Sequence, residues 1–233
     1  MSDNATLPPK INLDALFHRA SIFDSVEKLR DAGFQIVRGS ENRVTVFGHA
    51  SVPGYLFKKF LRNIKHPYEK QLTSYQKRVR GARDLRTHLD ALSIHSIGVP
   101  RKWLCELPPR FRLHGKPDYV VVVEKCGLLE RDHIKKRYRA LSKETVRDLC
   151  TILFTFEGVD FSLRNWPFTT EGKIACIDTR CLKRITKDLA FRQKSYKKYV
   201  KKKLLTGKSR RYAMSLWDVF KERGDPLRGL RKP

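Results

Sequence analysis

The spacing of apolar residues predicts that the chain begins with a short helix and a set of strands. Residues 24–32 carry a helical pattern that stops at Gly33. Beyond this glycine, apolar and polar residues alternate with a period of roughly two, which is typical of strands with one buried face. The alternation predicts a hairpin of residues 34–37 and 43–47 joined by a turn at 39–42, and a third strand at 55–60.

A change of period then marks one long helix. From Tyr68 to about Leu92, apolar residues recur at steps of three and four, which predicts an amphipathic helix. A fourth strand is expected at 99–104, and Tyr119–Glu124 contains an unbroken β-branched run. Such a run is the pattern of a central strand that is covered on both faces. Residues 34–124 should therefore form an antiparallel sheet with one long helix.

The second half of the chain is predicted to be mainly helical. Residues 125–128 have the composition of a linker, and Ser142 is placed to cap a helix whose apolar residues share one face. A strand is expected at 173–177, and the chain from Lys183 onward is predicted to be helical and very basic. These elements give an α+β fold with a segment at 1–33, a strand-rich lobe at 34–124 and a helix-rich lobe at 125–233. Ligands commonly bind in the cleft between two such lobes.

The charge narrows the class of partner. Fifty Lys and Arg stand against 24 Asp and Glu, a formal net charge of +26. A field of this sign favours nucleic acid, anionic lipid, acidic protein or nucleotide phosphates. The strongest basic stripe runs from Lys183 to Arg211 and includes Tyr196 and Tyr199. It is either a solvated helical face or a surface for a phosphate-rich partner or an anionic membrane.

Cysteine spacing and the N-terminus bear on the compartment. The five cysteines include no CxxC pair, which predicts free thiols in a reducing compartment. The N-terminus lacks the charged and apolar regions of a secretory signal, and the run Tyr119–Val123 is too short to cross a bilayer. We expect a soluble monomer with no transmembrane segment, either cytoplasmic or delivered into a host cell by a route that needs no signal.

Two aspartates and an asparagine stand out in a stretch with few other acidic residues. Asp160-Phe-Ser-Leu-Arg-Asn165 has the spacing D-x-x-x-x-N, and Asp178 directly follows the strand expected at 173–177. Asp and Asn are common loop residues. They are also hard oxygen ligands of the kind that magnesium prefers. The three residues are therefore either loop residues or the ligands of a magnesium site.

In these motifs and in its order of elements, the chain resembles the protein-kinase-like fold, and most closely the small divergent bacterial kinase-like proteins, including effector kinases. D-x-x-x-x-N is the form of the kinase catalytic loop, and Asp178 stands in the place of the Asp of Asp-Phe-Gly. Lys58 resembles the third-strand lysine of these proteins. The stretches that carry the likeness are Pro53 to Lys58, Arg78 to Ala82, Val122 to Gly127 and Gly172 to Thr179.

The resemblance implies a minimal two-lobed kinase-like fold with a truncated helical C-lobe. It implies ATP- and Mg-dependent phosphoryl transfer to an acidic protein or another anionic acceptor. Because side chains alternate along a strand, only one of Lys58 and Lys59 can face the nucleotide. The resemblance selects Lys58 and leaves Lys59 solvated. The implied site has Asp160 as the catalytic base, Asn165 and Asp178 on the metal, and Lys58, Glu124 and Cys126 at the nucleotide.

Other positions depart from the kinase pattern. Gly158-Val159 replaces the usual His-Arg, the turn at 38–43 has a single glycine, and no Ala-Pro-Glu follows Asp178. Glu69 is the only glutamate of the long helix that could pair with the strand lysine. The alternative is thus an inactive kinase-like protein or a basic module that binds nucleic acid or an anionic surface.

Two arginines on the long helix leave a choice open. Arg78 and Arg80 flank Gly81-Ala82. They belong either to a charged outer face or to a contact with phosphates or with Asp178.

Overall fold

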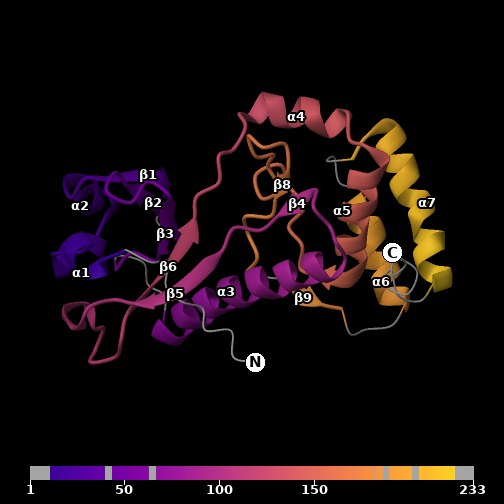
Figure 1. Ribbon diagram of the computed structural model, residues 1–233. Coiled ribbons are helices and arrows are strands. Elements are labelled where there is room, and N and C mark those ends of the chain that lie inside the picture. The colour runs from indigo at the N-terminus through magenta and orange to yellow at the C-terminus, as the bar shows by residue number, and fades with distance from the viewer. Residues whose placement is uncertain are drawn as a thin grey trace. The chain divides into compact units, whose positions relative to one another are not determined.

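The protein is a mixed α+β chain (Figure 1), seen in a computed structural model that describes residues 11–39, 44–62, 67–180, 182–185, 189–200 and 205–223. It divides into two compact units. Unit 1 comprises 1–80 and 101–125, and unit 2 comprises 81–100 and 126–233. Each unit has a hydrophobic core of its own.

Unit 1 is built on a five-stranded antiparallel sheet of order β1-β2-β3-β6-β5. The predicted hairpin, third strand and central strand are confirmed, and the central strand is buried from Val120 to Val122. Most of the turn predicted at 39–42 lies outside the described residues. The strands are β1 (Phe34–Arg38), β2 (Thr45–His49), β3 (Tyr55–Lys59), β5 (Lys102–Glu106) and β6 (Tyr119–Glu124).

The fourth predicted strand starts later than expected. It was predicted to begin at residue 99, but β5 begins at Lys102. Pro100 has no N–H to donate to a ladder, which disfavours a paired strand at this position. Residues 97–98 form a separate short strand, described below.

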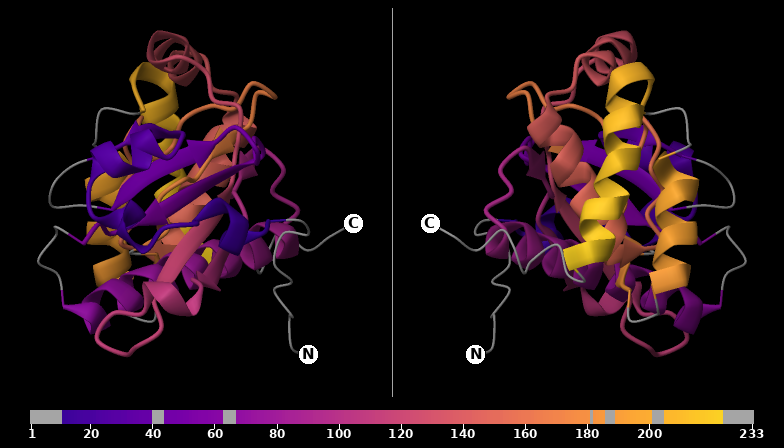
Figure 2. Two further views of the ribbon diagram at one scale, coloured as in Figure 1. Left: turned by 90° about the vertical axis from the view of Figure 1, so that its left-hand side faces the viewer. Right: turned by 90° about the vertical axis from the view of Figure 1, so that its right-hand side faces the viewer.

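The N-terminal elements of unit 1 pack on the sheet through aromatic rings. The Phe17 ring stacks on Phe34 at 5.5 Å between ring centres and meets the Phe57 ring edge-on at 5.4 Å. The helix predicted at 24–32 is confirmed as α2, and Ser25 Oγ accepts from Lys28 N at 3.3 Å as its cap. Figure 2 shows these elements beside the sheet. They are α1 (Leu13–Leu16), the 3₁₀ turn η1 (Ala20–Phe23) and α2 (Val26–Asp31).

The long predicted helix is confirmed as α3 (Tyr68–Ala91), and its residues belong to both units. In unit 1, the buried Tyr75 hydroxyl accepts from Phe60 N at 2.7 Å. In unit 2, Leu85 and Leu89 enter the hydrophobic core. The predicted apolar stripe is therefore shared between two cores.

Unit 2 is built on three helices that pack together (Figures 1 and 2): α5 (Lys143–Thr155), α6 (Leu189–Val200) and α7 (Gly207–Arg223). The predicted cap is confirmed, because Ser142 Oγ accepts from Thr145 N at 3.1 Å. The Phe154 ring lies 5.6 Å from Trp217 and 5.2 Å from Phe220. These contacts join α5 to α7.

The predicted basic stripe is only partly confirmed as a surface. Tyr196 is fully buried and packs on Trp217 at 5.6 Å, so it cannot stack on a base. The side chains of Lys198 and Tyr199, and residues 201–204, lie outside what the structure describes.

Two short strand pairs complete unit 2. β4 (Ile97–Gly98) pairs in parallel with β8 (Ile174–Ala175), and β7 (Phe156–Glu157) pairs antiparallel with β9 (Lys183–Arg184). The strand predicted at 173–177 thus has only two paired residues. The prediction of helix from Lys183 onward is wrong at its start, because Lys183 and Arg184 pair with β7, the strand that directly follows α5.

One helix was not predicted. α4 (Arg131–Arg139) follows the linker, and its only apolar residues are Ile134 and Tyr138, both buried. A further 3₁₀ turn, η2, spans Pro109–Phe111. The described cysteines, Cys105, Cys126, Cys150 and Cys176, are free thiols, as predicted, and Cys181 lies outside the described residues. Across the described ranges, no helix is both long and apolar enough to cross a membrane.

Candidate functional site

The D-x-x-x-x-N loop of unit 2 is a compact turn held between buried side chains. Gly158 precedes it at a φ of 73°, in the left-handed region that favours glycine. Phe161 and Trp166 are buried and their rings meet at 5.5 Å. Ser162 N donates to Asp160 O at 3.0 Å, and Trp166 N donates to Ser162 O at 2.9 Å. The turn therefore leaves the Asp160 side chain exposed on a fixed backbone.

Asp160 and Asn165 are bonded to each other across this turn. The Asn165 amide nitrogen donates to Asp160 Oδ2 at 2.6 Å and to Asp160 O at 3.4 Å. Asn165 is only 3% exposed. Because its nitrogen is engaged by Asp160, the amide oxygen is the atom that can ligate a cation.

Asp178 follows a segment that runs beside Asn165. Ile177 N donates to Asn165 O at 3.0 Å, and Ala175 N donates to Pro167 O at 2.8 Å. The Asp178 side chain is half-buried, and its Oδ1 accepts from Arg180 N at 3.2 Å. The structure thus brings Asp160, Asn165 and Asp178 together on two neighbouring backbone segments.

Two further parts of unit 2, Gly81 of the predicted helix α3 and the unpredicted helix α4, support these segments through contacts that the sequence did not reveal. Thr179, next to Asp178, is fully buried against Gly81 of α3. The Tyr138 hydroxyl of α4 donates to Trp166 O at 2.7 Å, one residue beyond Asn165. The spacing of Ile134 and Tyr138, four residues apart, is the only apolar signal that could have revealed α4.

Two of the predicted nucleotide contacts belong to unit 1. Lys58 is half-buried on β3, opposite Val121 of β6. Glu124 ends β6, and its Oε2 accepts from Arg101 N at 3.2 Å. Cys126 is half-buried and belongs to unit 2, as do Asp160, Asn165 and Asp178. The predicted site residues thus fall into two sets, one in each unit.

The prediction that Lys59 is solvated is wrong. Lys59 is 1% exposed, and its Nζ lies 2.6 Å from Asp118 Oδ1. The Nζ also lies 5.3 Å from the centre of the Phe23 ring and 5.9 Å from that of Tyr75. Burial lowers the pKa of Lys59, and the Asp118 carboxylate opposes that shift. Alternation along β3 therefore points Lys59 into the core of unit 1 rather than into water.

Two predictions about α3 are also resolved. Arg78 is 7% exposed, so the charged outer face is the wrong interpretation for it, whereas Arg80 is exposed. Glu69 is exposed and forms an ion pair with Lys116 Nζ at 2.9 Å.

The donor set suits a metal held mainly by its substrate. Among the residues that the structure describes, no three His, Cys, Asp or Glu side chains gather as a metal site. Asn165 and Asp178 offer one amide oxygen and one carboxylate. Magnesium is commonly bound by one or two carboxylates, waters and substrate phosphates. Asn165 and Asp178 could therefore supply two oxygen ligands to a magnesium ion, with the remaining positions left to water or substrate.

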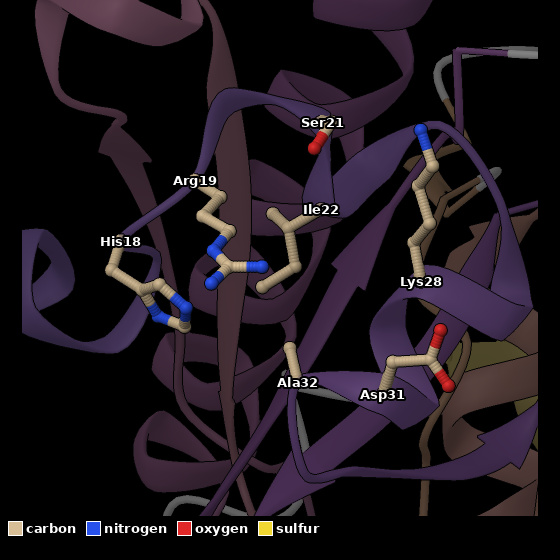
Figure 3. Close-up of a pocket in the computed structure, with 7 residues that line it drawn as sticks. All are labelled: His18, Arg19, Ser21, Ile22, Lys28, Asp31 and Ala32. Carbon is tan, nitrogen blue, oxygen red and sulfur yellow. The ribbon is translucent and has the colours of Figure 1, made fainter.

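A surface cavity of about 470 Å³ lies in unit 1, away from the predicted site residues in sequence (Figure 3). Its lining mixes basic, hydroxyl, acidic and apolar side chains from the region of η1 and α2. None of the residues predicted to bind nucleotide or metal is among its seven lining residues, which are His18, Arg19, Ser21, Ile22, Lys28, Asp31 and Ala32.

In comparisons with known proteins, the chain matches no family model and no curated protein.

Proposed function

We propose that the chain is an ATP- and Mg-dependent phosphotransferase of minimal, two-lobed kinase-like type that acts on a protein or another anionic acceptor. One observation carries the proposal: Asn165 bonds to Asp160 through its side chain and to Ile177, next to Asp178, through its carbonyl. Kinase chemistry requires an acceptor-orienting carboxylate beside two metal ligands. The bond between Asp160 and Asn165, and the bond that holds Ile177, the neighbour of Asp178, beside Asn165, support that assignment.

In this proposal, Asp160 handles the acceptor proton. Its exposed carboxylate orients the acceptor hydroxyl and takes its proton, while Asn165 fixes the carboxylate by donating to Oδ2. The acceptor oxygen forms a bond to the γ-phosphorus as the bond between that phosphorus and the β,γ-bridging oxygen breaks, and ADP leaves. The phosphorylated acceptor and one proton on Asp160 balance the reaction.

The metal and the nucleotide are assigned to the remaining residues. Asn165 Oδ1 and the Asp178 carboxylate would hold Mg²⁺, which when bound neutralises charge on the β- and γ-phosphates. The Lys58 ammonium would neutralise charge on the α- and β-phosphates. Glu124 and Cys126, which flank the end of β6, would contact the nucleotide base.

Nucleotide binding tests the proposal directly. A ligand at 100 times its dissociation constant stabilises the folded state by about 2.7 kcal/mol. We expect ATP with Mg²⁺ to raise the melting temperature of the wild type and of Lys77→Met, a control at an exposed lysine of α3. Lys58→Met should lose most of that increase. An ATP-induced shift of equal size in Lys58→Met would contradict the assignment of this lysine.

A further inference from the structure

Helix α4 has one buried face and one strongly cationic face. Ile134 and Tyr138 are buried, whereas every lysine and arginine of the helix is exposed. Figure 1 shows α4 next to the loop that leads to β8. The exposed cations of α4 are Arg131, Lys135, Lys136, Arg137 and Arg139.

Exposed cations also lie at the starts of α5 and α7. Lys143 opens α5, and its Nζ lies 5.8 Å from the centre of the Tyr212 ring of α7. Lys208 and Arg211, in the first turns of α7, are exposed. Lys143, Lys208 and Arg211 together with the five cations of α4 are called the α4 surface below.

Acidic residues offset only part of this charge. Asp132 forms an ion pair with Lys135 at 2.8 Å. Glu130 and Glu144 are the other exposed carboxylates of residues 130–144, a stretch that also holds six lysines and arginines. The α4 surface thus keeps a clear positive excess, which attracts anions at a distance set by the ionic strength.

The buried face of α4 packs on the segment that directly follows the candidate catalytic loop. Tyr138 donates to Trp166 O at 2.7 Å, and its ring meets Phe168 at 5.2 Å. Leu129 N, just before α4, donates to Phe168 O at 2.9 Å. These contacts begin one residue after Asn165, so whatever binds the α4 surface is held near the loop that carries Asp160 and Asn165.

We propose that the α4 surface docks an acidic segment of a protein acceptor. Arg131, Lys135 and Arg139 recur every fourth residue, which spaces them by about 6 Å along the helix axis. Alternate side chains of an extended peptide lie on one face at about 6.6 to 6.8 Å. Acidic residues at alternate positions of an extended segment can therefore pair with this row.

A protein suits the surface better than nucleic acid. Proteins that bind single strands use exposed aromatic rings on which bases stack. The tyrosine of α4 is 3% exposed and bonded to Trp166, so the helix offers charge without a stacking platform. That the docked protein is also the phosphate acceptor rests on the proposed function, whereas the docking itself does not.

The test measures binding of a labelled Glu-x-Glu-x-Glu peptide to the full chain by fluorescence anisotropy without ATP. Arg131→Glu/Arg139→Glu should weaken binding about tenfold, since reversing two exposed pairs removes on the order of 1.4 kcal/mol. The control Lys77→Glu/Arg80→Glu makes the same change in net charge at exposed positions of α3, outside the α4 surface. It should weaken peptide binding less than about threefold. Arg131→Gln/Arg139→Gln removes the two charges without reversing them, so it disturbs folding less than the glutamate variant does. Its loss of peptide affinity should lie between those of the wild type and of Arg131→Glu/Arg139→Glu.

The outcomes separate docking from catalysis. Equal losses in the α4 and α3 variants would overturn the proposal, because binding would then follow the net charge of the chain. Loss of poly(U) binding in the α4 variant, with no preference for the acidic over a neutral peptide, would overturn the protein partner in favour of nucleic acid. Peptide binding that survives Asp178→Ala supports docking. If a serine-containing version of the bound peptide is not phosphorylated by a wild type that does label itself or another acceptor, the docked segment is not the phosphate acceptor, while the docking stands.

Discussion

The backbone of Gly81 in α3 lies directly against the carbonyl oxygen of Thr179, the residue after Asp178. A β-carbon at position 81 would overlap that oxygen and lie 3.3 Å from the Thr179 Cβ. Thr179 is fully buried, so it has little freedom to retreat. The absence of a side chain at Gly81 therefore lets the helix support the segment that carries Asp178.

Gly81→Ala should destabilise the protein although alanine is the better helix former. The helix propensity gain is up to about 1 kcal/mol. Overpacking against a buried backbone typically costs about 1 to 3 kcal/mol. We expect a net loss in the free energy of unfolding, measured with urea, and reduced phosphoryl transfer.

Gly98→Ala is the matched control, because no atom lies within 4 Å of the position that its β-carbon would take. It should change the stability little. A Gly81→Ala protein more stable than the wild type would show that the close approach to Thr179 has no energetic consequence.

The buried pair of Lys59 and Asp118 predicts an asymmetric response to mutation. Lys59→Met leaves the Asp118 carboxylate buried without its cation and should cost about 3 to 5 kcal/mol of unfolding free energy. Lys59→Met/Asp118→Leu removes both charges and should recover much of that loss. Chemical denaturation of both variants, with Lys58→Met as the half-buried neighbour, measures the difference. If the double variant is less stable than Lys59→Met, the pair is not the reason for the loss.

Asp148 predicts a pH dependence of stability. It is 6% exposed, its Oδ2 accepts from Ser96 Oγ at 2.7 Å, and burial raises its pKa. The folded state thus holds the proton more tightly than the unfolded state does. The contribution of Asp148 to the free energy of unfolding is therefore greatest below about pH 4, the ordinary pKa of an aspartate. It should fall as the pH rises through the raised pKa of the folded state, and it should stay low at neutral pH.

Asp148→Asn keeps an acceptor for Ser96 and removes the charge. Its melting temperature should exceed that of the wild type at pH 7, and the difference should shrink toward pH 4. Asp90→Asn, at an exposed position of α3, should show no such trend. A gain that is the same at both pH values would mean that titration of Asp148 is not its source.

Much of the fold followed from local periodicity. The hairpin of β1 and β2 has a period of two, and β6 contains an unbroken β-branched run. The apolar residues of α3 recur at steps of three and four, and those of α5 share one face. α4 was missed because only Ile134 and Tyr138 of its nine residues are buried apolar side chains. Lys183–Arg184 was misassigned because its strand exists only by pairing with Phe156–Glu157, which local sequence does not encode.

In the candidate site too, local spacing predicted some features, whereas others depend on residues far apart in the sequence. Asp160 and Asn165 are five residues apart, so their spacing was informative, and the structure bonds them. Alternation along β3 places Lys59 on the same face as the buried Phe57, but its partner Asp118 lies 59 residues away, and no local pattern identifies that partner. Long-range pairing therefore decided what single-sequence reasoning could not.

The most direct test of the proposed function is transfer of label from [γ-³²P]ATP with Mg²⁺, to the protein itself or to an acidic acceptor. The wild type and Asp218→Ala, a control at an exposed aspartate of α7, should incorporate label. Asp178→Ala should fall by at least about a hundredfold, the usual effect of removing a group that stabilises transition-state charge. If the wild type and Asp178→Ala incorporate equally little label, and ATP with Mg²⁺ does not raise the melting temperature of the wild type, the protein is not a phosphotransferase of this kind.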